Sequence, residues 1–395
     1  MTLMPSPDED RLTFFARADF HNKAQLVGIR QADRFAHMYV LGKTGTGKST
    51  LLETLVRLDI QDGNGLMLLD PHGDLAERIR DAVPEERRDD VIWFDVPDAS
   101  RPMGLNPMEI PPGASASLAV SNLLEIFRKL WADSWGPRLE HVLRNAFLAL
   151  MDQPDATLAD VLRLISDKDF RNRVVGETAN GQVRAFWRDE FARYSPAFRA
   201  VIVAPIQNKI GAFLADPLLN AIVTQRRSAF DLRNVMDRGK VLLVNLAKGR
   251  IGEDAAALLG ALLMTKAGLA GLSRASIAEE ARRPFFVYAD EFQTFTTLGT
   301  AGMLSELRKY RVGMVLAHQY VSQLDPAVRD AVLGNAGTMV SCRLGATDAH
   351  RIAKEFEPEV RAIDLMSLPN YHVYLKVMAH GAVSRPFSAE TIRVR

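Results

Sequence analysis

The 395-residue sequence has a single cysteine, Cys342. One thiol excludes an intramolecular disulfide framework and a cysteine-based zinc site, and it is typical of a protein kept in a reducing cytoplasm. The eight histidines also lack the spacing of metal ligands. The sequence therefore gives no support to a disulfide-stapled secreted domain or to a histidine–cysteine metal centre.

An excess of charge of one sign is likewise missing, because 49 Lys and Arg residues balance 48 Asp and Glu residues to leave a net charge of +1. The net charge therefore neither supports nor excludes nucleic-acid binding, and any basic surface must be local. Residues 1–11 contain no basic region followed by an apolar one, so they do not predict a secretory signal. The longest apolar run, residues 255–272, is interrupted by Thr265 and Lys266 and predicts a buried helix.

What the sequence does have is a glycine-rich loop between an apolar strand-like run, residues 38–41, and a helix-like segment with apolar residues at helical spacing. Residues 42–49 match G-x-x-x-x-G-K-[ST], the phosphate-binding loop of P-loop NTPases. Glycines let the backbone approach a phosphate, and the N–H groups at the helix start attract anions. We expect Lys48 to reach the β- and γ-phosphates and Ser49 to ligate Mg²⁺. The predicted nucleotide-binding residues are Gly42, Lys43, Thr44, Gly45, Thr46, Gly47, Lys48, Ser49 and Thr50.

Short apolar runs alternate with helical patterns on both sides of a central region, which predicts an α/β fold with a mostly parallel sheet. The run 66–70 ends in Asp70, and Asp74 follows. Both acids would lie at the carboxyl edge of the sheet, where ligands gather, although Asp74 is equally suited to cap the helix predicted over 75–82. Further strands are expected over 240–246, 284–291, 313–319, 338–344 and 371–377.

The central region has no strand-like run and consists of helical patterns. We therefore predict three parts: a lead-in and the first part of the nucleotide-binding domain over 1–112, an all-helical insertion over 113–228, and the second part of the nucleotide-binding domain over 229–395. Arginines in the insertion are mixed with acidic residues. This mixture favours a solvated helical face over a nucleic-acid patch.

Hydrolysis by a P-loop protein needs a carboxylate near Mg²⁺ and a group that orients water. The apolar run 285–289 ends in Asp290 and Glu291, which is the Walker B pattern. We expect Asp290 to hold the Mg²⁺ shell and Glu291 to orient the attacking water. Gln319 ends the next apolar run, where an amide can contact the γ-phosphate or the water. The spacing of the basic residues in the segment 308–311, taken alone, favours a solvated helix face over a catalytic arginine finger.

Five motifs occur in an order that resembles the HerA/FtsK superfamily of ring-shaped ATPases, and most closely the TraG/TraD-like coupling ATPases of conjugative type IV secretion. The similarity extends over residues 26–380. The motifs are the P-loop at 42–49, Leu-Asp-Pro-His-Gly-Asp-Leu at 69–75, Leu-Asn-Pro-Met at 105–108, Ala-Asp-Glu-Phe at 289–292 and Val-Leu-Ala-His-Gln at 315–319.

The resemblance implies a RecA-like core, a homohexamer, and ATP- and Mg²⁺-dependent movement of DNA through a central channel. It implies that Arg308 acts as an arginine finger in a neighbouring subunit's site. Lys248 and Arg250 are candidate pore-facing DNA contacts, together with the segment 294–302. A relaxase or secretion-channel proteins are possible partners, and the expected location is cytoplasmic, with possible attachment to the inner membrane through a partner.

Membrane-embedded coupling proteins begin with transmembrane helices, which this sequence lacks. Three explanations stay open: a separate membrane protein, a truncated chain, or a soluble branch of the superfamily. Three other functions also stay open. One is a HerA-like helicase or translocase in DNA repair or defence, and another is a P-loop switch that binds ATP to organise partners. The third is a motor that moves protein substrates, which the sequence does not separate from DNA transport. Glu291 argues against the switch, which does not need a residue dedicated to orienting water.

Overall fold

The computed structural model describes residues 10–19 and 25–393. Part of the predicted N-terminal lead-in, residues 1–9, lies outside the described residues. The chain forms two compact units, each built from separated segments. We call them the sheet unit (Met1–Phe94, Val235–Asn245 and Ile277–Arg395) and the helical unit (Asp95–Asn234 and Leu246–Ser276).

The sheet unit is organised around an eleven-stranded mixed sheet, which confirms the predicted α/β class with its parallel core. In sheet order the strands are β2 (Gln25–Arg30), β1 (Leu12–Ala18), β13 (Phe387–Thr391), β10 (His372–Lys376), β9 (Thr338–Ser341), β3 (Met38–Leu41), β8 (Val312–His318), β7 (Phe285–Ala289), β4 (Gly65–Asp70), β6 (Val241–Asn245) and β5 (Val91–Asp95). A small hairpin pairs β11 (Met378–Ala379) with β12 (Ala382–Val383).

The five central strands from β3 to β6 in this order pair in parallel, as do β3 and β9. Every residue of β3, β4, β6, β7 and β8 is buried. A strand covered on both faces must be apolar throughout, which is why these segments read as continuous apolar runs in the sequence. Strands β1, β2, β10 and β13 pair antiparallel at one side of the sheet.

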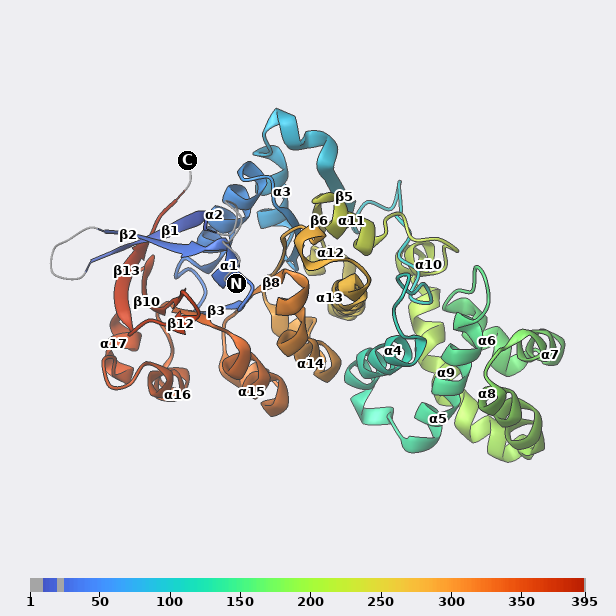
Figure 1. The fold of residues 1–395 in the computed structure, drawn as a ribbon. Helices are drawn as coiled ribbons and strands as arrows, with labels where there is room; N and C mark the ends of the chain where they lie inside the picture. The colour runs from blue at the N-terminus through green and yellow to red at the C-terminus, as the bar shows by residue number, and fades with distance from the viewer. Residues whose placement is uncertain (1–9, 20–24, 394–395) are drawn as a thin grey trace. The chain divides into compact units, whose positions relative to one another are not determined.

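Helices cover both faces of this sheet, as Figure 1 shows. Right-handed crossovers require that connections running in opposite directions along the sheet lie on opposite faces. Accordingly α2 (Lys48–Gln61) and α3 (Asp74–Asp81) lie on one face, and α14 (Leu298–Leu307), α15 (Pro326–Asn335) and α16 (Ala346–Phe356) lie on the other. The short helices α1 (Gln31–Arg34), α11 (Leu232–Arg238) and α17 (Ala362–Ser367) complete the chain around it.

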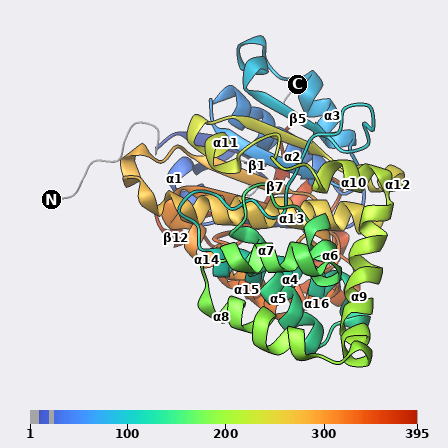
Figure 2. The same cartoon turned by 90° about the vertical axis from the view of Figure 1, so that its right-hand side faces the viewer.

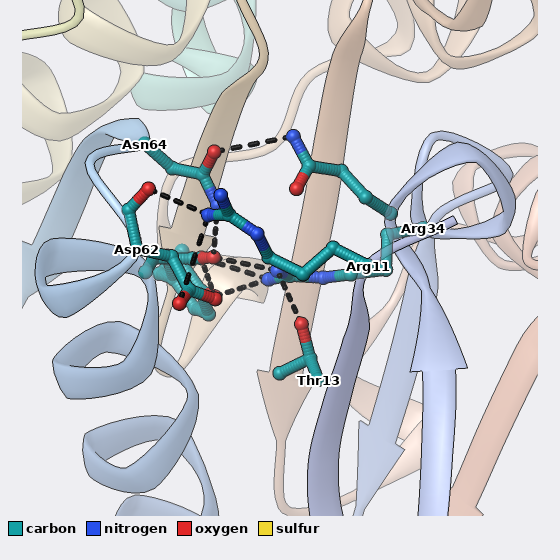
Figure 3. Close-up of polar contacts among 8 residues, drawn as sticks. Arg11, Thr13, Arg34, Asp62 and Asn64 are labelled. Atoms are coloured by element: carbon teal, nitrogen blue, oxygen red, sulfur yellow. Dashed lines mark hydrogen bonds and ion pairs between the residues drawn. The ribbon is translucent and has the colours of Figure 1, made fainter. Parts of the chain in front are cut away.

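A buried ion pair fixes the P-loop helix to the sheet at the end remote from the P-loop (Figure 3). The Arg34 guanidinium donates to both carboxylate oxygens of Asp59, at 2.5 and 2.8 Å, and also to Thr13 and to the Tyr288 hydroxyl. The Tyr288 hydroxyl donates in turn to Asp59. Because Tyr288 lies on β7, the cluster joins α1, α2 and the strand that leads to Asp290.

The helical unit packs its helices against one another around its own apolar core; Figure 2 shows α4, α5 and α9 face on. Its helices are α4 (Ala116–Leu130), α5 (Pro137–Met151), α6 (Ala159–Ser166), α7 (Lys168–Glu177), α8 (Gly181–Ala185), α9 (Pro196–Ala215), α10 (Pro217–Val223), α12 (Lys248–Ile251) and α13 (Glu253–Ser273). A π-helical turn, Phe186–Glu190, follows α8.

The helical unit begins at Asp95 and takes in α13, whereas the sequence places the insertion at 113–228. Helix α13 packs against α4, so its apolar residues belong to the helical core. The segment Glu253–Ser276 is the one described helix that is long and apolar enough to cross a membrane, and most of it is buried in the protein, in agreement with the predicted buried helix.

Candidate nucleotide site

The P-loop connects β3 to α2 and needs glycine at two kinds of position. Gly47 has φ of 112°, a backbone conformation that side-chain-bearing residues rarely adopt. At Gly42 the constraint is space, because a Cβ there would lie 2.5 Å from the Cβ of Cys342. The loop can therefore keep its curve and its close approach to the strand only with glycine at these places. Gly45, at φ of 75°, faces open space at the loop's outer side.

Lys48 is the first residue of α2 and its side chain is buried. Its Nζ atom donates to the carbonyl oxygens of Gly42 and Lys43, at 2.6 and 3.2 Å. The ammonium thus lies inside the curve of the P-loop and is held there by uncharged acceptors. A phosphate bound in the loop would supply the counter-charge for the Lys48 ammonium.

Ser49, at the start of α2, contacts Asp290, which follows β7; these are the two residues that the sequence analysis assigns to Mg²⁺. The Ser49 hydroxyl donates to an Asp290 carboxylate oxygen at 3.1 Å. Burial raises the pKa of Asp290 to about 6, and the neighbouring carboxylate of Glu291 acts in the same direction. Such crowding of negative charge favours a divalent cation, and a hydroxyl with a carboxylate suits Mg²⁺.

Glu291 and Gln319 also meet at this edge of the sheet. Gln319 Nε2 donates to one carboxylate oxygen of Glu291, and the Thr44 hydroxyl of the P-loop donates to the side-chain oxygen Oε1 of Gln319 at 2.8 Å. The other carboxylate oxygen of Glu291 accepts a hydrogen bond of 2.6 Å from Gln293. A continuous hydrogen-bonded chain therefore runs from Thr44 of the P-loop through the Gln319 amide to Glu291 and on to Gln293.

Sequence reasoning gave no role to Gln293 or to His318. Gln293 lies in a 3₁₀ turn, Phe292–Thr294, and an isolated glutamine carries no motif that could have identified it. His318 is fully buried and hydrogen-bonds to the Tyr39 hydroxyl at 2.5 Å, which ties β8 to β3 just before Gln319. Burial lowers the pKa of His318 to about 3, so this link stays uncharged at neutral pH.

Asp70 has a structural role at the same edge. Its carboxylate accepts backbone N–H groups of His72, Leu75 and Ala76, at 2.8 to 3.0 Å, and so caps α3. Asp74 is the first residue of α3 and is exposed. The capping role considered for Asp74 is thus filled by Asp70.

Arg308 lies away from the P-loop of its own chain. It follows α14 and precedes β8, whereas Gln319 follows β8, so the strand's length separates them. Seven residues at the usual strand rise amount to roughly 20 Å. Arg308 is exposed at a cavity of about 420 Å³, lined also by His37, Glu355 and Lys376.

The candidate DNA contacts Lys248 and Arg250 lie in α12 of the helical unit. Arg250 is exposed, whereas Lys248 has the carboxylate of Glu253 at 3.9 Å. In the described part of the chain no cluster of three or more His, Cys, Asp or Glu side chains could hold a metal ion. A cation at Ser49 and Asp290 would need further oxygen ligands, which nucleotide phosphates and water commonly provide.

Together the P-loop after β3, the acidic pair after β7 and the amide after β8 define a P-loop NTPase with a RecA-like core. The chain belongs to the family described as the type IV secretion-system coupling protein DNA-binding domain, whose model matches residues 24–350. The resemblance to coupling ATPases drawn from the motifs is thereby confirmed.

Solved structures share the fold at low sequence identity. The plasmid coupling protein TrwB in complex with ADP and Mg²⁺ is 17% identical, with a TM-score of 0.65, covering 99% of this chain and 91% of that chain. TrwB in complex with a non-hydrolysable ATP analogue is also 17% identical, with a TM-score of 0.65, over 99% and 96%. VirB4 of Thermoanaerobacter pseudethanolicus is 13% identical, with a TM-score of 0.66, over 98% of both chains. A search of curated proteins finds no match.

Proposed function

We propose that this protein is an ATP-hydrolysing DNA translocase that acts as the coupling ATPase of a conjugative type IV secretion system. The observation that carries the proposal is the convergence of Lys48, Ser49, Asp290, Glu291 and Gln319 at one edge of the sheet. The family's DNA-binding description supports DNA as the substrate. The TrwB structures with ADP and Mg²⁺ and with an ATP analogue support the choice of nucleotide and metal.

Each residue has a distinct task in this proposal. Lys48 neutralises the β- and γ-phosphates. Backbone N–H groups and hydroxyls enclose these phosphates, and they come from residues 42–47, Ser49 and Thr50. Ser49 and Asp290 would hold Mg²⁺, which supplies positive charge to the phosphates when bound. Glu291 orients the attacking water, and Gln319 senses the γ-phosphate.

The proposed assembly is a homohexamer in which Arg308 completes the site of a neighbouring subunit. The separation of Arg308 from Gln319 along β8 supports action between subunits, because the side chain is too far away to serve its own P-loop. The Arg308 side chain is exposed and, within the described residues, makes no hydrogen bond or ion pair, which leaves the guanidinium available.

DNA would contact the pore-facing segments, with Arg250 and Lys248 as contacts to its phosphates. We place the protein on the cytoplasmic side, attached to the inner membrane through a partner. A relaxase or secretion-channel protein is the partner expected for a coupling ATPase.

Steady-state ATP hydrolysis tests the proposal when it is measured with and without DNA for the wild type and for Glu291→Gln. We expect DNA to stimulate the wild type and the variant to bind ATP without turning it over. Glu86→Gln, the same chemical change at an exposed residue of the 3₁₀ turn Glu85–Asp90, serves as a control that should keep both rates. A wild type that hydrolyses ATP at a rate independent of single- and double-stranded DNA at every salt concentration would refute the DNA motor.

A further inference from the structure

Both carboxylate oxygens of Glu291 are occupied by side-chain amides. Gln319 donates to one oxygen, and Gln293 donates to the other at 2.6 Å. Glu291 itself is only 6% exposed, so water competes poorly for these oxygens. Hydrogen bonds to a charged acceptor in such a setting are among the stronger ones in proteins.

The backbone of Glu291 is also unusual. Its φ is 48°, in the left-handed region that residues with side chains seldom occupy. Such a conformation persists only where surrounding contacts hold it, and it is frequent at sites that change state. The two amide contacts and the bond from the Glu291 N–H to the Asp290 carboxylate, at 3.0 Å, supply that restraint.

The two amides differ in what can release them. Gln319 also accepts from Thr44 on the P-loop, so its release is linked to the nucleotide. Gln293 instead adjoins the segment 294–302, which runs into α14 and is one of the two proposed DNA-facing segments. A displacement of that segment would be transmitted directly to Gln293, because only a peptide bond separates Gln293 from Thr294.

We propose that Gln293 is a positioning residue that holds Glu291 away from the attacking water until DNA displaces the segment 294–302. This inference rests on the proposed function, because it takes Glu291 as the residue that orients water. Gln293 thereby makes hydrolysis depend on the presence of DNA. The restraint uses an uncharged donor, so it needs no change of protonation to be released.

The test compares the wild type with Gln293→Met, which keeps the side chain's length and removes its N–H donors. Gln323→Met is the matched control, because Gln323 is an exposed glutamine in another 3₁₀ turn, Val321–Gln323. ATP hydrolysis is measured for the full chain without DNA and with saturating linear double-stranded DNA. Gln293→Ala is the second variant, and binding of a fluorescent ATP analogue shows that each variant keeps a folded site.

We expect Gln293→Met to raise the DNA-free rate on the order of tenfold, as the loss of one charge-assisted hydrogen bond allows. The DNA-saturated rate should change little, so the stimulation ratio falls. Adding Glu291→Gln should abolish the gain. DNA-free rates that stay unchanged or fall in both Gln293 variants overturn the inference, as does a stimulation ratio equal to that of Gln323→Met.

Failure of the proposed DNA motor and failure of the inference about Gln293 are distinguishable in the same experiment. A wild type without DNA stimulation refutes the DNA motor, whereas the effect of Gln293→Met on the DNA-free rate is read independently of DNA. A stimulated wild type with unaltered Gln293 variants refutes only the inference.

Discussion

The change Asp59→Asn should strongly destabilise the protein, although Asp59 lies at the end of α2 remote from the P-loop. Asp59 lies on α2 and is fully buried, and its carboxylate accepts from Arg34, Tyr288 and Asn64. Burial would lower the pKa of Arg34, but Asp59 and Tyr288 raise it above its ordinary value, so the guanidinium stays charged. The substitution therefore leaves a buried cation without its counter-charge.

Breaking a buried pair in this way typically costs about 3–5 kcal/mol. For a folded unit of this size that corresponds to a fall in Tm of at least about 6 °C. The matched control is Glu53→Gln, the same chemical change on the same helix, where the partners Arg57 and Arg78 are at 3.1 and 3.0 Å but the pairs are partly exposed. Such pairs contribute about 1 kcal/mol or less.

Thermal unfolding followed by circular dichroism, in nucleotide-free buffer and at one scan rate, measures both variants. The double change Arg34→Met with Asp59→Leu should recover part of the loss, because it removes the cation together with the carboxylate. Equal Tm values for Asp59→Asn and Glu53→Gln would contradict the reasoning that the buried pair anchors the P-loop helix.

Further predictions concern the site itself. Lys48→Ala should abolish binding of a fluorescent ATP analogue while Tm changes little, since the lost bonds go to carbonyls; retained binding would contradict the role of Lys48. The raised pKa of Asp290 means that the nucleotide-free native state binds a proton more tightly than the unfolded chain, so stability should fall as pH rises from about 4 to about 6 and then level. Asp290→Asn should remove that dependence and stabilise the nucleotide-free protein at pH 7.5 by up to about 3 kcal/mol, measured by denaturant unfolding; an unchanged pH profile would refute the assignment. The Arg308→Ala protein and the Lys48→Ala protein should each be inactive alone. When Arg308→Ala is mixed with an excess of Lys48→Ala, ATP hydrolysis should return if Arg308 acts between subunits, because the Lys48→Ala subunit supplies the arginine to the intact P-loop of its neighbour. Replacing Lys248 and Arg250 with alanine should reduce DNA stimulation and its dependence on salt, whereas unaltered stimulation removes them as contacts.

The parallel core could be predicted because its strands are buried on both faces. Residues 38–41 and 285–289 are apolar at every position, and the structure has strands at those bounds. The carboxyl ends of such strands converge, so the proximity of Ser49 to Asp290 and of Glu291 to Gln319 follows from the motif order.

Other features depend on contacts that no local pattern encodes. Gln293 reaches Glu291 only because a 3₁₀ turn follows the left-handed residue, and Asp59 looks in the sequence like one more polar residue of a helix. The boundary of the helical unit at Asp95 and its inclusion of α13 arise from packing between segments far apart in the chain. Sequence periodicity identifies α13 as buried without saying which core it joins.

The most direct test of the DNA motor is displacement of a third strand from a DNA triplex, which requires movement along the duplex. The wild type with ATP and Mg²⁺ should release the labelled third strand, and Glu291→Gln should bind the same DNA without releasing it. Release that is equal with ATP, with a non-hydrolysable analogue and with Glu291→Gln would contradict translocation driven by hydrolysis at this site.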